Sequence, residues 1–253
     1  MGFDTTELDQ DSPVPLYIQI EQRIGRAVNV GELEPMSRVS SELKLAATFG
    51  VSRMTARKAV DRLVAEGMLF RRQGKGTFVA PPKIAHGLST QLSFGQAMSA
   101  LGLQLSTTVL RNSMAPAPDE VANALQIVPG ASTVYIRRLR IVEGQPAAIH
   151  SSYLPGGYGA ILNHDLSGSL TSAMAAVGAR VEHSRDTVEA VLASPDEAEE
   201  LGIEAGSPLL MIEGVAFSAG TPVRYTKALY RGDRFKFSVD TSQPADLRVE
   251  IKQ

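Results

Sequence analysis

The sequence predicts an α+β protein built from two domains. Residues 16–67 contain three stretches with apolar side chains at helical spacing, and a short hairpin pattern follows them. Two prolines at 81–82 then interrupt the chain, and the remainder repeats one order of elements: helix, strand, turn and strand. We therefore expect a first domain at 1–80, a linker at 81–90 and a second domain at 91–253.

The first domain is expected to contain three helices. The segment LYIQIEQRIGRAV has an apolar side chain at every third or fourth position, which predicts the first of them. The second helix has Ser41 or Ser40 as its N-cap and ends at Gly50. The third begins after Ser52 and ends at Gly67. The connection between the second and third helices is so short that the pair fits a helix-turn-helix.

A β-hairpin is expected directly after the third helix. The segment MLFRRQGKGTFVA, residues 68–80, has two short β-prone runs on either side of a turn that contains glycine. Pro81 and Pro82 end the second strand, because proline has no backbone N–H for a ladder. The alternative is that this segment is only a structural hairpin of a small helical domain.

The second domain is expected to contain two copies of one unit. The first copy begins at Pro118 and the second at Pro195, and each contains a Pro-Asp-Glu helix start and a hairpin with a Gly-x-Pro turn. A strand is also expected in VEHSRDTVEAVLA and a helix in SLTSAMAAVG. Together these elements predict an antiparallel sheet with helices on one face.

Composition excludes several classes of protein. The chain has no cysteine, so disulfides and thiolate metal sites are impossible. No apolar run reaches the roughly 20 residues of a membrane span, and the acidic N-terminus does not resemble a signal peptide. The four histidines lack metal-ligand spacing, and no P-loop or Gly-x-Ser-x-Gly motif occurs. We expect a cytoplasmic protein without cofactor, metal, membrane contact or enzymatic activity.

Charge is distributed unevenly along the chain. Residues 37–80 contain nine basic and three acidic residues, a net charge of +6 in a chain whose overall charge is −2. A basic module on an otherwise acidic chain indicates a polyanionic partner, although a solvated charged face is the plain alternative.

The third helix and the hairpin have the residues that contact with DNA requires. An α-helix fits the major groove, where residues near its N-terminus reach the base edges. The turn after the first strand of the hairpin carries one cation, and its glycines allow close backbone approach. The expected DNA-binding residues are Arg38, Ser41, Lys44, Ser52, Arg53, Thr55, Arg57, Arg72, Gln73, Gly74, Lys75, Gly76 and Thr77.

The segment VSSELKLAATFGVSRMTARKAVDRLVAEGMLFRRQGKGTFVA resembles the winged helix-turn-helix of the GntR regulators. The segments LSFGQAM, IRRLR, GQP, SYLP and YRGDRFKF resemble the UTRA effector-binding domain of the HutC subfamily, which has a chorismate-lyase-like fold. The resemblance implies a homodimeric repressor that releases double-stranded, palindromic operator DNA when a small metabolite binds. An activator, an architectural DNA-binding protein and a lyase-like enzyme are the alternatives.

The first domain departs from the family pattern at two positions. Leu43 stands where the family commonly has arginine, and Ser40 where it commonly has proline. Because that arginine normally helps to hold DNA, one implied contact is missing. Arg38 and Lys44 are nearby cations that could replace it.

The duplication identifies a candidate anion site in the second domain. When the copies are aligned on their glycines, Arg138 and Arg140 fall opposite Gly214 and Ala216, so the strand does not need arginine for folding. Residues i and i+2 of a strand point to the same face, which places this pair together and Arg137 on the other side. Two such guanidinium groups suit a phosphate or carboxylate; a salt-bridged solvent face is the alternative.

The resemblance extends this site to further residues. Matching positions are Ser93, Phe94, Ser169 and Tyr230, and departing positions are His150 and Arg224, where sugar-binding relatives often have glutamate, and Thr171, where they have tyrosine. Loss of two carboxylates and gain of one arginine favour a small anionic effector over an N-acetylhexosamine phosphate. A phosphorylated or sulfonated sugar, a sugar acid or a carboxylate would suit.

Overall fold

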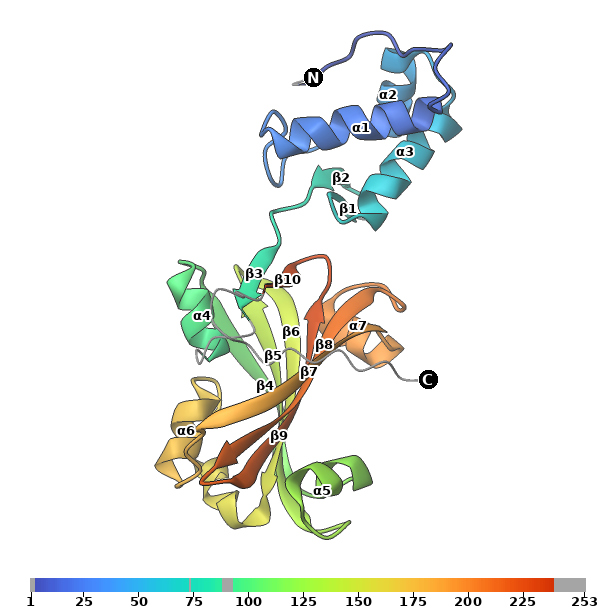
Figure 1. The fold of residues 1–253 in the computed structure, drawn as a ribbon. Helices are drawn as coiled ribbons and strands as arrows, with labels where there is room; N and C mark the ends of the chain where they lie inside the picture. Colours follow the sequence, from blue (N-terminus) through green and yellow to red (C-terminus); the bar gives the residue numbers. More distant parts are fainter. Residues whose placement is uncertain (1–2, 73, 88–92, 239–253) are drawn as a thin grey trace. The chain divides into compact units, whose positions relative to one another are not determined.

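The structure is a computed structural model that describes residues 3–72, 74–87 and 93–238 (Figure 1). It divides into two compact units between Lys83 and Ile84. In the described part of the chain, no helix is both long and apolar enough to cross a membrane.

The first unit contains the three helices and the hairpin that the sequence predicts. Its elements are α1 (Leu16–Asn29), α2 (Glu42–Phe49), α3 (Arg53–Ala65), β1 (Leu69–Arg72) and β2 (Gly76–Val79), with β1 antiparallel to β2. The predicted winged helix-turn-helix is confirmed.

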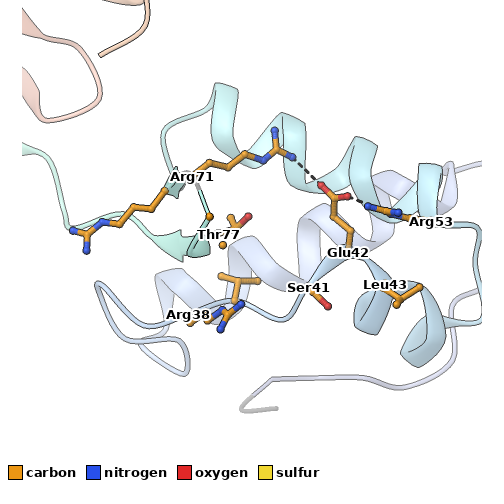
Figure 2. A pocket seen from close by; sticks show the side chains of 11 residues that line it. Arg38, Ser41, Glu42, Leu43, Arg53, Arg71 and Thr77 are labelled. Atoms are coloured by element: carbon orange, nitrogen blue, oxygen red, sulfur yellow. Dashed lines mark hydrogen bonds and ion pairs between the residues drawn. The ribbon is translucent and has the colours of Figure 1, made fainter. Parts of the chain in front are cut away.

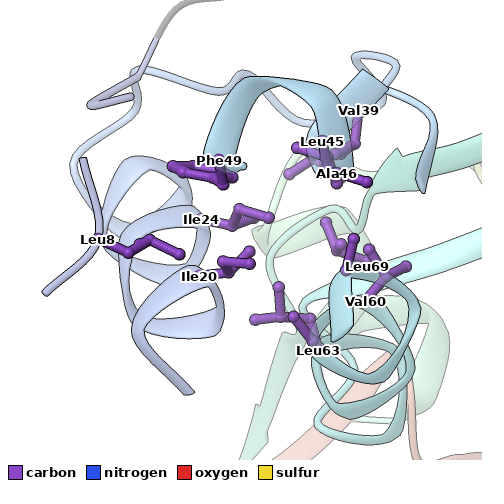
Figure 3. Close-up of a cluster of buried hydrophobic side chains, with 13 residues drawn as sticks. Leu8, Ile20, Ile24, Val39, Leu45, Ala46, Phe49, Val60, Leu63 and Leu69 are labelled. Carbon is purple, nitrogen blue, oxygen red and sulfur yellow. The ribbon is translucent and has the colours of Figure 1, made fainter. Parts of the chain in front are cut away.

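The apolar stripes of the three helices meet in one core, shown in Figure 3. Ile20 and Ile24 of α1 are fully buried and belong to one cluster with Phe49 of α2 and Leu63 of α3. Leu69 of β1 belongs to the same cluster, so the core also fixes the start of the hairpin. The helical spacing of the sequence is therefore what orients α3 with its polar face outward.

Local capping sets the helix-turn-helix connection. Of the two candidate serines, Ser41 is the N-cap of α2, and its side chain accepts a hydrogen bond from the backbone N–H of Lys44. Gly50 ends α2 with a φ of +64°, which a glycine adopts without strain. Ser52 then caps α3 by accepting from the N–H of Thr55 at 3.1 Å. Gly50 and Ser52 thus specify the turn between the two helices.

The second unit is organised around a six-stranded sheet. Its elements are β3 (Ile84–Gly87), α4 (Phe94–Ala100), β4 (Leu105–Pro116), α5 (Asp119–Leu125), β5 (Ser132–Val142), β6 (Gln145–Pro155), the 3₁₀ helix η1 (Gly156–Asn163), α6 (Leu170–Ala176), β7 (His183–Leu192), α7 (Pro195–Leu201), β8 (Pro208–Ser218), β9 (Thr221–Arg231) and β10 (Phe235–Ser238). The sheet order is β4-β5-β6-β9-β8-β7, and every neighbouring pair is antiparallel.

The predicted duplication is present in the fold. The order β4-α5-β5-β6 recurs as β7-α7-β8-β9, and the two copies meet where β6 pairs with β9. The turn positions differ from the predicted Gly-x-Pro turns: the residues with positive φ are Glu143 and Gly144 in one hairpin and Ala219 and Gly220 in the other. The glutamine and threonine that follow already belong to strands, because two residues with positive φ suffice for a tight hairpin turn.

Helices cover both faces of the sheet, which corrects the expectation of helices on one face. Helices α4 and α6 pack on the face presented by Val134 and Ile136 of β5, and α5 and α7 pack on the opposite face (Figure 1). The long strands are apolar at both odd and even positions, as with buried Leu154 and Ile149 of β6, so both faces need a cover.

The predicted linker is shorter than 81–90. Residues Ile84–Gly87 form β3, which pairs in parallel with β10, far away in the sequence. Ile84 packs against the apolar cluster that contains Phe235, and this contact holds the segment in place. Residues 88–90 of the predicted linker lie outside the described residues.

Candidate DNA-binding face and candidate effector site

The N-terminus of α3 presents two arginines to solvent. The side chains of Arg53 and Arg57 are 71% and 56% exposed. Each has one loose acidic neighbour, Glu42 at 3.8 Å and Asp61 at 3.7 Å. Such exposed pairs contribute little stability, so both guanidinium groups can turn to a phosphate or a base.

Arg71 links the hairpin to both helices of the helix-turn-helix. Its guanidinium lies 3.1 Å from Glu42 of α2 and 2.6 Å from Asp61 of α3. Figure 2 shows Glu42 between Arg71 and Arg53. Sequence reasoning missed Arg71 as a positioning residue because its two partners are distant in the chain. This network orients the hairpin relative to α3.

A hollow between α2, α3 and the hairpin collects many of the predicted DNA-binding residues (Figure 2). Those lining it are Arg38, Ser41, Arg53, Arg72, Gly74, Gly76 and Thr77. Thr55 and Arg57 line a second hollow, together with Lys58. Lys44, Ser52 and Lys75 are exposed but line neither of these two hollows. Gln73 lies outside the described residues.

Leu43 also lines the first hollow, with 68% of the residue exposed. It stands where the resemblance implies an arginine, so the wall formed by α2 is apolar at this point. Arg38 lines the same hollow and supplies a cation there, whereas Lys44 does not line it.

Gly76 at the start of β2 is required by the backbone and by Arg38. Its φ is +113°, and a side-chain carbon there would lie 3.0 Å from the Nε of Arg38. We expect Gly76→Ala to lower the free energy of unfolding by about 1–3 kcal/mol through backbone strain, measured by urea denaturation. It should also weaken DNA binding, because Arg38 must move.

Gly31→Ala is the matched control for this prediction. Gly31 has a φ of +80°, a side-chain carbon there would meet no atom within 4 Å, and the residue lines neither hollow. The substitution should cost only the left-handed backbone penalty, about 1–2 kcal/mol, and leave Arg38 undisturbed. Equal losses of DNA binding in both variants would contradict the role given to Arg38.

The candidate effector site lies on the face of the sheet that α4 and α6 cover. Strand register places Arg138 beside His150 of β6 and Arg140 beside Ala148. Ala148 in turn pairs with Tyr230 of β9. Arg224 lies on the same face of β9, six residues before Tyr230. The structure thus brings predicted residues from three strands to one face.

Arg137 points to the opposite face, as the alternation predicts. Its guanidinium donates to the carboxylate of Glu200 on α7 at 2.6 Å and to the hydroxyl of Ser151 at 3.0 Å. Arg137 therefore belongs to a structural ion pair, in contrast to Arg138 and Arg140.

The arginines of the site are buried without an acidic partner. Arg138 and Arg140 are only 5% and 4% exposed, and Arg224 is partly buried. Among the described residues, no carboxylate forms an ion pair with any of the three, and each Nε is buried without a hydrogen-bond partner. The negative charge of Asp186 acts on Arg224 without forming an ion pair with it. Buried cations that lack an ion pair are costly, which makes this cluster a candidate for anion binding.

The cluster shifts the titration of its own members. Burial, together with the positive charges of Arg140 and Arg224, lowers the pKa of Arg138 to about 9. Burial and the positive charges of these arginines hold the pKa of His150 well below its usual value. His150 is thus neutral near pH 7, and its Nε2 is buried without a partner in the described structure. A neutral imidazole has one nitrogen that donates and one that accepts, so it can form a hydrogen bond with a hydroxyl group of a ligand.

Aromatic rings close one side of the site. The ring of Phe94 lies 5.2 Å from that of His150 and 5.7 Å from that of Tyr230. The guanidinium of Arg140 stacks over Phe94 at 5.2 Å. His86 of β3 contacts Phe94 and Tyr230, at 5.7 and 6.1 Å. Sequence reasoning missed His86, because only the pairing of β3 with β10 brings it here.

The predicted hydroxyl residues have local roles as well. Ser93 caps α4 by accepting from the N–H of Gln96, and Ser169 caps α6 by accepting from that of Ser172. The Nη1 of Arg138 donates to the carbonyl oxygen of Gly168 at 3.2 Å, which places Ser169 next in the chain to this contact. Ser169 and Thr171 are exposed, and within the described residues no ion pair or hydrogen bond joins Thr171 to the arginines.

A winged helix-turn-helix joined to a separate antiparallel sheet domain defines a class of two-domain, DNA-binding transcriptional regulators. Residues 16–79 match the gntR family of bacterial regulatory proteins, and residues 100–236 match the UTRA domain. The chain belongs to the GntR family and is of its HutC type.

Named relatives and solved structures agree with this assignment. The chain is 33% identical over 233 residues to the HTH-type transcriptional repressor NagR of Bacillus subtilis, covering 91% of this chain and 96% of that protein. It is 32% identical over 227 residues to the histidine utilization repressor of Pseudomonas putida, covering 89% and 92%. The crystal structure of PhnF from Mycobacterium smegmatis matches with a TM-score of 0.62 at 25% identity, covering 88% of this chain and 98% of that one.

Proposed function

We propose that the protein is a repressor that binds a palindromic operator as a homodimer and releases it when a small anionic metabolite binds to the second unit. Two relatives that are similar over most of their length are named repressors, which supports this direction of control. The proposed effector is a phosphorylated or sulfonated sugar, a sugar acid or a carboxylate.

The observation that carries the proposal is the cluster of buried arginines on one face of the sheet. Arg138, Arg140 and Arg224 come from two strands, and their Nε atoms lack partners within the described residues. An anion bound there would form charge-assisted hydrogen bonds and remove the repulsion between the cations. An anionic ligand therefore suits the chemistry of this site.

A route from the site toward the DNA-binding unit is supported by contacts of β3. Phe94 and Tyr230 belong to the site and contact His86, and β3 begins directly after the last residue of the first unit, Lys83. An effector that moves these rings would move the segment leading to the DNA-binding unit. The size of the change is limited by the difference in effector affinity between the two states.

The test is operator binding followed by release. Operators are selected from random DNA with the full chain, and binding is measured by fluorescence anisotropy at two salt concentrations. We expect a palindromic sequence and a steep loss of affinity with salt. Phosphorylated, sulfonated and carboxylated metabolites are then added, with neutral sugars as controls. Release by neutral sugars only, or selection of no sequence, would contradict the proposal.

A further inference from the structure

We propose that the effector carries two anionic groups at separate positions, one bound by Arg138 and Arg140 and the other by Arg224. The inference rests on the proposed function, since it specifies the ligand of the same site. It predicts a compact polar molecule with a phosphate or sulfonate at one end and a carboxylate or second such group at the other.

The two cationic centres come from different strands. Arg138 pairs with His150, which pairs with Ala228 of β9, and Arg224 lies four residues before Ala228. With strands about 4.8 Å apart and a rise of about 3.3 Å per residue, the Cα atoms of the two arginines are about 16 Å apart. Their side chains start from well-separated points of the sheet, although both reach toward the segment that contains α6.

The contacts of the two guanidinium groups keep them apart. Arg138 donates through Nη1 to the carbonyl oxygens of Leu166 and Gly168, before α6 begins. Arg224 reaches the Sδ of Met174, within α6, at 3.7 Å. Gly168 lies before the N-cap of α6, whereas Met174 lies within the helix, so the two contacts are made at different points of this segment. A single phosphate accepts from donors that meet at one point, so one group cannot replace both sets of contacts.

The charges facing this surface leave room for more than one anion. On the six strands of the sheet, Asp186 is the only acidic residue on this face. Glu189 and Glu213 point to the opposite face, because successive side chains of a strand alternate between faces. The carboxylate of Asp186 accepts a hydrogen bond from Ser184 at 2.6 Å and lies against Gly214. It forms no ion pair with Arg224 in the described structure. Three arginines therefore share this face of the sheet with a single carboxylate.

The uncharged groups beside Arg138 and Arg140 suit the hydroxyl groups of such a ligand. His150 lies beside Arg138 in the sheet, is neutral near pH 7, and has its Nε2 free of any partner in the described chain. Tyr230 lies against it, with ring centroids 5.3 Å apart. These are hydrogen-bonding groups without charge, as hydroxyl groups require. Phosphorylated sugar acids and phosphorylated hydroxy acids combine a phosphate, a carboxylate and uncharged hydroxyl groups.

The test uses two pairs of probes that differ at one end. Glycerol 3-phosphate is compared with 3-phosphoglycerate, and glucose 6-phosphate with 6-phosphogluconate, by isothermal titration calorimetry on the full chain. In at least one pair we expect the acid to bind at least tenfold more tightly than its partner without the carboxylate. Arg224→Met should remove this ratio, and Arg185→Met, on the opposite face of edge strand β7, should preserve it.

The outcomes separate this inference from the proposed function. If the phosphorylated probes bind but neither acid binds more tightly, or if Arg224→Met retains the ratio, the two-anion inference is wrong and the single-anion effector stands. If no phosphorylated probe binds, the two-anion inference is wrong. The proposed function is wrong as well if sulfonated and carboxylated metabolites also fail to release the operator. Circular dichroism melting of each variant establishes that a lost ratio does not come from unfolding.

Discussion

Replacing Arg138 with methionine should make the ligand-free protein more stable and insensitive to anions. Arg138 is buried, and the positive charges of Arg140 and Arg224 repel its own positive charge. No carboxylate forms an ion pair with it in the described structure. Replacing a buried ion pair with apolar residues is often neutral or raises the free energy of unfolding by about 1–4 kcal/mol, and Arg138 has no ion-pair partner in the described structure that its loss would leave unpaired. Thermal unfolding should show the higher melting temperature, and anisotropy should show an operator complex that anions no longer release.

Arg137→Met is the matched control on the neighbouring position of the same strand. Arg137 forms an ion pair with Glu200 and donates to Ser151, so its loss should destabilise the protein by about 1.5–3 kcal/mol. Its response to anions should be retained. A destabilised Arg138→Met that still responds to anions would contradict the assignment of Arg138 to the effector site, because such behaviour belongs to a structural arginine.

Replacing Arg57 with alanine should weaken operator binding by about 1–3 kcal/mol while leaving effector binding intact. Its side chain is exposed near the start of α3, and its one acidic neighbour is Asp61 at 3.7 Å. Anisotropy against the selected operator and against base-substituted operators measures the effect. Relaxed discrimination at one base pair indicates that Arg57 contacts a base. If the slope of log affinity against log salt concentration falls by about one, Arg57 contacts a phosphate of the DNA backbone.

Arg26→Ala is the control for the loss of one positive charge. Arg26 is exposed in the last turn of α1, away from the N-terminus of α3 in the chain. Its removal should change operator affinity only slightly, because it only weakens the long-range electrostatic attraction between the protein and the DNA. If Arg26→Ala and Arg57→Ala weaken binding equally and without change in sequence preference, α3 does not read the operator through Arg57.

Much of the first unit could be predicted because its determinants are local. Ser52 and Gly50 act within three or four residues of their positions, and the apolar spacing of α1 and α3 sets their buried faces. The Arg71 network could not be predicted in this way. Its partners are fixed only when α2, α3 and the hairpin pack together, since the local sequence places no constraint on which carboxylates Arg71 meets.

The second unit divides along the same line. Alternation along β5 is enough to place Arg138 and Arg140 on one face and Arg137 on the other. The family resemblance added Arg224 to this site. The packed fold was needed to show that His86 joins them, that helices cover both faces, and that residues 84–87 form a strand. Periodicity is a property of neighbouring residues, whereas strand register and helix packing depend on contacts between residues that are far apart in the chain.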